Sequence, residues 1–104
     1  MDKYEIQSII KTIESCIYYH DKMRYAYFFS SPSTSKGRRY YEMQNSIEKS
    51  FTYKDNTYTY WSKCYCSSQH VYFSDGFTVD GQRKDVRAFK RVLKELKEKT
   101  DNND

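Results

Sequence analysis

Three cysteines and two histidines are the residues of this sequence whose types and spacing could bind a metal ion. Cys16 and His20 are four residues apart in a segment with helical periodicity, so their side chains project from adjacent turns of one face. Cys64 and Cys66 are two residues apart in a strand-like segment, so they point to one side of it. If the helix packs on that side, three thiolates and one imidazole converge, which is a common ligand set for tetrahedral zinc.

Such a site would be structural, because protein ligands fill all four positions whereas catalytic zinc keeps one position open for water. Soft sulfur ligands also favour Zn²⁺ over calcium or magnesium. Two alternatives stay open. His70 lies four residues after Cys66 and could replace His20 as the fourth ligand. The cysteines could also be buried packing residues without a metal, since cysteine is among the most buried residue types.

No pattern for catalysis accompanies the candidate metal ligands. The three glycines are scattered along the chain and cannot build a phosphate-binding loop. Neither histidine has a serine or cysteine in a nucleophile-like context, and the sequence signature of zinc deaminases is absent. We therefore expect that the protein is not an enzyme.

Two amphipathic helices are predicted at the ends of the chain. In residues 3–23, isoleucines recur at helical spacing, and Asp2 is a plausible N-cap with Glu5 three residues later. A second apolar stripe predicts a helix that begins near Asp80, as its cap or just before it, and runs to about residue 99.

Between the helices, tyrosine and threonine favour β-structure, although residues 38–53 suit either type. We predict a loop at 30–37, and turns at 54–56 and 74–76. The expected strands are residues 24–29, 38–53, 57–65, 70–73 and 77–79.

This order predicts an α+β fold: an N-terminal helix, an antiparallel sheet of about four strands, and a C-terminal helix, with both helices on one face of the sheet. We expect one domain over residues 1–100, stabilised by zinc, and a disordered polar tail at 101–104.

Positive charge is concentrated near the C-terminus. Residues 83–99 hold eight basic and three acidic residues, while the chain as a whole carries a net charge of +4. A second basic group precedes two tyrosines in the middle of the chain. The candidate partner-binding residues are Arg83, Arg87, Lys90, Arg91, Lys94, Arg38, Arg39 and Tyr40. Basic residues beside stacking rings suit nucleic acid, an acidic protein surface fits equally well, and a solvated helix face is the plain alternative.

Twelve tyrosines in 104 residues point to protein recognition, because tyrosine offers a large contact area at low entropic cost. The sequence has no apolar run that could span a membrane, and its charged beginning does not look like a signal peptide. We expect a cytoplasmic protein without a small-molecule substrate.

The sequence is short and rich in tyrosine, and it has a candidate structural metal site. In this overall character it resembles the anti-CRISPR proteins of phages and mobile elements. It is most similar to the metal-binding kind of the type II-A group, on the residues Cys16, His20, Cys64 and Cys66. The resemblance implies a phage protein in the bacterial cytoplasm that inhibits Cas9 by docking on the nuclease and blocking nucleic-acid loading. The alternative is a zinc-stabilised nucleic-acid-binding or transcriptional module that uses the basic C-terminal helix.

Overall fold

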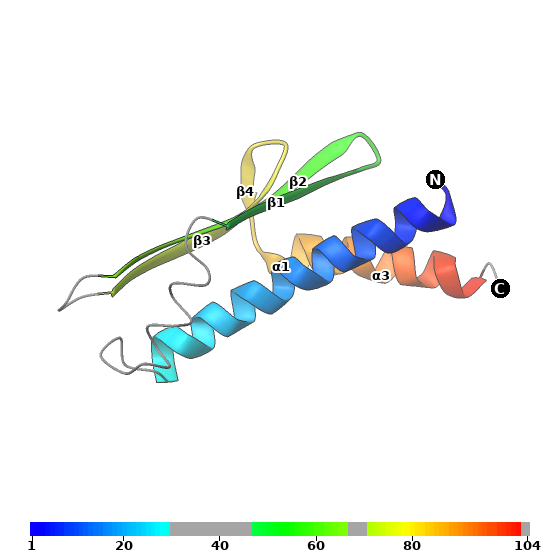
Figure 1. The fold of residues 1–104 in the computed structure, drawn as a ribbon. Coiled ribbons are helices and arrows are strands. Elements are labelled where there is room, and N and C mark those ends of the chain that lie inside the picture. Colours follow the sequence, from blue (N-terminus) through cyan, green and yellow to red (C-terminus); the bar gives the residue numbers. More distant parts are fainter. Residues whose placement is uncertain (30–46, 67–70, 103–104) are drawn as a thin grey trace.

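The computed structural model describes residues 1–29, 47–66 and 71–102, and places the side chains of residues 1–21, 47–63 and 74–100. The elements within these ranges are two helices and four strands (Figure 1). In chain order they are α1 (Lys3–Phe29), β1 (Ile47–Tyr53), β2 (Asn56–Cys66), β3 (Val71–Val79), β4 (Gln82–Lys84) and α3 (Val86–Asn102).

The described strands form one antiparallel sheet in the order β1-β2-β3-β4, so each strand pairs with its neighbour in sequence. A two-residue turn joins β1 to β2, where Lys54 and Asp55 both have positive φ angles, the backbone that tight hairpins require. The prediction of an α+β fold, with a helix at each end and a four-stranded antiparallel sheet between them, is confirmed.

A ring cluster joins α3 to the sheet. Phe89 of α3 is fully buried and packs edge-on against Phe51 of β1, Tyr58 of β2 and Phe77 of β3, at centroid distances of 4.8 to 5.7 Å. Edge-to-face pairs of this kind add to the energy gained by burying the rings. α3 is therefore fixed on the sheet by one central aromatic residue.

The apolar stripe of α1 completes the core. Its Ile6, Ile13 and Cys16 are buried, and α1 lies alongside α3 (Figure 1). At the surface, Lys97 of α3 and Glu14 of α1 form an exposed ion pair with a distance of 3.6 Å. Such a pair adds little stability, so the contact between the helices rests mainly on apolar burial.

Helix α1 begins as predicted but ends later. The backbone N–H of Glu5 donates to Asp2 Oδ1 over 2.8 Å, which confirms Asp2 as the N-cap. The predicted strand at 24–29 is wrong, because the helix continues to Phe29. No glycine or proline interrupts this segment. The strand preference of its aromatic residues is too weak to end a helix without such a residue. The predicted loop at 30–37 and residues 38–46 lie outside the described residues.

The predicted turn at 74–76 is also wrong, because these residues lie inside the continuous strand β3. Gly76 pairs with Trp61 of β2, and a Cβ atom on Gly76 would come within 2.8 Å of the indole Nε1. The glycine is therefore needed for a close approach of the indole to the strand rather than for a turn.

A tight turn and the short strand β4 precede the last helix. Asp80 and Gly81 have positive φ, and the Asp80 carboxylate accepts a hydrogen bond of 2.8 Å from the Thr57 N–H. The expectation that Asp80 caps the helix or lies just before it is therefore wrong, because β4 intervenes and α3 begins at Val86. Asp85 is the cap, because its carboxylate accepts a hydrogen bond of 2.8 Å from the Arg87 N–H. α3 includes Asp101 and Asn102, and residues 103–104 lie outside the described part of the chain.

Candidate functional site

A polar cluster lies between α1 and the sheet. His20 of α1 contacts the carboxylate of Asp75 through Nδ1, and the hydroxyl of Tyr60 donates to the same oxygen, Asp75 Oδ2, over 3.2 Å. The side chains of His20 and Asp75 are only 12% and 13% exposed. An ionised carboxylate only accepts hydrogen bonds, so both neighbours are donors to it. The cluster therefore ties the helix to β2 and β3.

Burial shapes the chemistry of two groups beside this cluster. Cys16 is fully buried, and burial raises the pKa of its thiol from 9.0 to about 11. Burial, and next the charge of Asp75, raise the pKa of the Tyr60 hydroxyl above its ordinary value. Without a metal, Cys16 is thus a neutral thiol at physiological pH, and a thiol of this kind is inert as a nucleophile.

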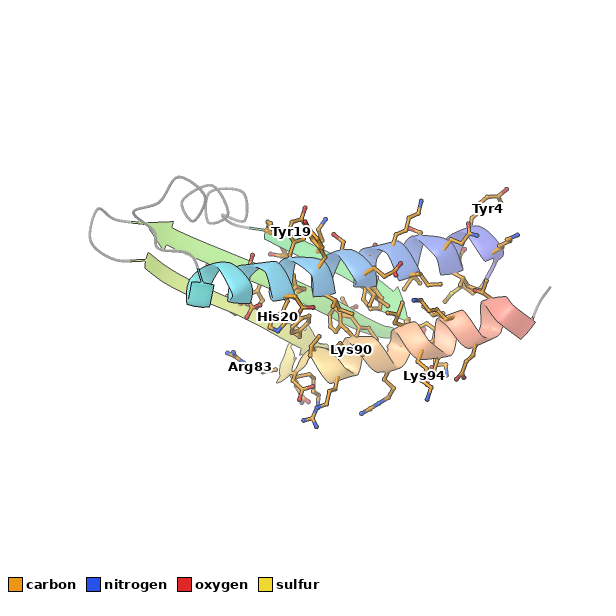
Figure 2. The ribbon with its side chains drawn as sticks, turned by 90° about the horizontal axis from the view of Figure 1, so that it is seen from below. Tyr4, Tyr19, His20, Arg83, Lys90 and Lys94 are labelled. Atoms are coloured by element: carbon orange, nitrogen blue, oxygen red, sulfur yellow. The ribbon has the colours of Figure 1, made fainter. Side chains whose placement is uncertain are left out.

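The structure describes only half of the predicted zinc site. Cys16 and His20 lie on the inner side of α1, as the helical spacing predicts: Cys16 is fully buried, and Figure 2 shows His20 on this side. The backbone of Cys64 and Cys66 belongs to β2, opposite β3, but their side chains are outside the described set, as is the whole of His70. Among the side chains that are placed, no three potential ligands gather. The zinc site stays a prediction.

The contact between His20 and Asp75 is compatible with His20 as a metal ligand. The Asp75 carboxylate holds Nδ1, and a histidine that binds a metal commonly donates its other ring nitrogen to a carboxylate in this way. Sequence reasoning missed Asp75 because it was read as part of a turn. The alternation of β3 would have placed it beside Ser62, its partner in the strand register.

The basic residues of α3 form a row on its surface, and we name Arg87, Lys90, Arg91 and Lys94 the basic stripe. Their spacing of three and four residues puts them on one side of the helix, and all four are exposed. Figure 2 shows Lys90 and Lys94 following one another along α3, with Arg83 ahead of its first turn. The stripe is therefore a continuous positive edge about two turns long.

An open groove of about 840 Å³ adjoins the stripe. It lies between α3, the turn that joins β1 to β2, and the hairpin of β3 and β4. Tyr58, Val79 and Ala88 line it and are half-buried, so apolar surface is available there. Because Arg87 and Arg91 also line the groove, the basic stripe forms one of its edges.

Positive charge predominates at this groove. Five basic and two acidic side chains line it: Lys54, Arg83, Lys84, Arg87, Arg91, Asp85 and Glu95. Both acidic groups are neutralised locally. Lys54 lies 3.5 Å from Glu95, and Arg87 lies 2.6 Å from Asp85. Hydrogen bonds from Arg87 lower the pKa of Asp85, and a hydrogen bond from Tyr53 lowers that of Glu95. Among the placed side chains, no ion pair involves Arg83, Lys84 or Arg91.

Of the predicted basic residues of the C-terminal segment, Arg83, Arg87 and Arg91 line the groove, as do two further lysines, while Lys90 and Lys94 lie on the adjoining stripe. Lys54 and Lys84 were missed. Lys84 could have been found from its place beside Arg83, whereas Lys54 reaches the groove only through the hairpin turn. The other predicted group, Arg38, Arg39 and Tyr40, lies outside the described residues.

Comparison with known proteins gave no match: no family model, no curated protein and no solved structure resembles this chain significantly. Neither described helix combines the length and the apolar character that spanning a membrane requires.

Proposed function

We propose that this protein binds nucleic acid by placing a phosphate backbone along the basic stripe of α3. The observation that carries the proposal is the arrangement of Arg87, Lys90, Arg91 and Lys94. Four exposed cations occupy one side of a helix, and only Arg87 has an ion-pair partner among the placed side chains. A row of exposed cations, three of them without an ion pair among the placed side chains, matches the repeated charge of a phosphate backbone, and their binding releases counterions from the nucleic acid.

The placement of α3 supports this proposal. His20 of α1 and Phe89 of α3 both pack edge-on against Phe77, at 5.0 and 4.8 Å. We infer from these two contacts that both helices cover one face of the sheet. The buried Phe89 anchors α3 by its inner side, which leaves the basic stripe on the outer side for a ligand. A rigid helix also loses little conformational entropy when it binds.

The proposal is tested by neutralising the stripe. The triple variant Lys90→Gln, Arg91→Gln, Lys94→Gln removes three charges from it. The matched control Lys3→Gln, Lys11→Gln, Lys63→Gln removes the same charge from exposed positions elsewhere. Fluorescence anisotropy with labelled oligonucleotides should show a loss of affinity of at least about tenfold for the stripe variant and a much smaller loss for the control. Equal losses in both variants would contradict the proposal.

The resemblance to anti-CRISPR proteins leads to a different proposal, a Cas9 inhibitor that docks on the nuclease. In that case the basic stripe would meet an acidic protein surface instead of phosphates. A cleavage assay with Cas9 and its guide distinguishes the two functions. Inhibition of Cas9 together with no binding to free nucleic acid would favour the inhibitor, while binding to free oligonucleotides without inhibition would favour the nucleic-acid module.

A further inference from the structure

The groove beside the basic stripe combines positively charged edges with an apolar lining. A phosphate backbone alone would need the charges but not the apolar lining. The edges of the groove carry Arg83, Lys84 and Arg91, which have no ion pair among the placed side chains. Tyr58 and Ala88 between these edges are apolar and half-buried. Cations beside an accessible apolar lining match a nucleotide, which joins an anionic phosphate to a planar, largely apolar base.

The side chains of α3 make room for such a group. Ala88, Arg91 and Glu95 recur at three and four residues, so one side of the helix faces the groove. The side chain of Ala88 ends at Cβ. A larger side chain at this position would occupy part of the groove. Tyr58 lies on the sheet side of the groove. One face of its ring is stacked on Phe51, at 4.8 Å and an interplanar angle of 2°, so the ring is held in a fixed orientation.

The two acidic groups of the groove do not oppose an anion strongly. Arg87 donates to Asp85 through both Nε and Nη2, over 2.9 and 2.6 Å. Glu95 accepts a hydrogen bond of 2.9 Å from Tyr53 and pairs with Lys54. With both carboxylates matched by a cation, the remaining three basic residues leave the groove with a net positive charge.

We infer that the groove holds a base of single-stranded nucleic acid, with the adjoining phosphates on Lys84 and Arg91. The inference rests on the proposed function and narrows its ligand from nucleic acid in general to single strands. In a duplex the bases are stacked and paired, and a base can enter a groove of this kind only after it leaves the stack. Phosphate contacts alone would favour the duplex, because its charge density is higher. A preference for single strands therefore reports the base contact.

The wild-type protein tests the inference with three labelled ligands of about 16 nucleotides: a normal single strand, an abasic single strand and a duplex. The abasic strand keeps the phosphates and lacks the bases. We expect the normal single strand to bind roughly tenfold more tightly than the abasic strand. The contact of one base with an aromatic side chain accounts for an affinity difference of about this size. The duplex should also bind more weakly than the normal strand.

Equal affinity for normal and abasic strands, or tightest binding to the duplex, would overturn the inference and leave the proposed function intact. No binding to any of the three ligands would overturn both.

A variant pair localises the effect. Ala88→Leu fills the groove and should reduce the affinity for the normal strand to that for the abasic strand, whereas Ser8→Leu adds a similar side chain at an exposed position of α1 and should change neither. Thermal melts show whether the Ala88 variant is folded, and the comparison of ligands on the wild type does not depend on it. Unchanged affinity in a folded Ala88→Leu protein would overturn the inference.

Discussion

At the scale of single residues, the carboxylate of Asp75 connects α1 to the sheet. It accepts hydrogen bonds from His20 and Tyr60, in a region where water has little access. Asp75→Asn keeps an acceptor oxygen but removes the negative charge that strengthens both hydrogen bonds. We expect it to lower the free energy of unfolding by about 1–3 kcal/mol.

Urea denaturation measures this loss. The control Asp21→Asn changes an exposed carboxylate on α1, next to His20, and should cost less than about 0.5 kcal/mol. If both variants unfolded at the urea concentration of the wild type, the contact between Asp75 and His20 would not be holding α1 on the sheet.

The buried thiol of Cys16 predicts how stability depends on pH in the absence of metal. Its pKa is raised to about 11 in the folded protein, against 9.0 for an ordinary cysteine. The unfolded chain therefore loses its thiol proton first as the pH rises. The stability from the neutral thiol is fully present below pH 9 and is lost progressively up to about pH 11, by about 2 kcal/mol.

Urea denaturation at several pH values in the presence of a chelator checks this dependence. Tyr60 contributes in the same direction, because its pKa is raised as well. Cys16→Ala should remove the Cys16 part of the decline between pH 9 and 11 and keep the Tyr60 part. An identical decline in both proteins would show that the thiol of Cys16 is not responsible.

The zinc site is a prediction at the same scale. Elemental analysis of the purified protein should find stoichiometric zinc, and Cys64→Ser should lose it together with a large drop in melting temperature, because metal binding adds directly to folding free energy. Ser50→Ala on the exposed edge of β1 is the control and should keep the metal. A metal-free wild type whose melt ignores a chelator would leave Cys16 as a packing residue.

At the scale of elements, Gly76 tests the packing of the central strands. Gly76→Ala puts a Cβ atom within 2.8 Å of the Trp61 indole, so β2 and β3 or the ring must shift. We expect a loss of about 1–3 kcal/mol, although alanine is normally the better residue in a strand. Trp61 is the chain's one tryptophan, so its fluorescence reports the change directly.

A double variant isolates the clash. In a Trp61→Leu background the indole is absent, and Gly76→Ala should then cost little or even stabilise the strand. A loss of the same size in both backgrounds would assign the cost to the backbone of β3 instead of the ring.

The elements show which sequence signals suffice to predict a fold. Apolar stripes and the cap at Asp2 located both helices, because amphipathic periodicity records the side that must be buried. Tyrosine and threonine in residues 57–65 located β2, and Tyr60 and Ser62, two residues apart on one face of it, are both buried. Glycine as a local signal for a turn was less reliable. Gly76 looked like a turn residue, but it makes room for an indole that lies elsewhere in the sequence.

The candidate site was predictable in part for the same reason. The basic stripe could be read from spacing within α3, since all its members belong to one helix. The groove could not, because Lys54, Val79 and Ala88 come from three segments that only the hairpins bring together. Asp75 was not recognised as a site residue because residues 74–76 were wrongly predicted to form a turn.

At the scale of the whole molecule, charge and packing are segregated. The aromatic residues Phe51, Phe77 and Phe89 are buried in the core, while the basic stripe of α3 is exposed. Attraction of an anionic polymer by this edge should be long-ranged at low salt and weak above physiological salt, because the Debye length shortens from about 30 Å at 0.01 M to about 8 Å at 0.15 M.

The most direct test of the central claim, that α3 binds a phosphate backbone, is the salt dependence of single-strand binding by the wild type and by the variant Lys90→Gln, Arg91→Gln, Lys94→Gln. We expect the logarithm of the wild-type association constant to fall linearly with the logarithm of salt concentration. Each phosphate contact adds about 0.7 to the slope, so the variant should be shallower by about 2. A wild-type affinity that ignores salt, or a variant with an unchanged slope, would contradict the account.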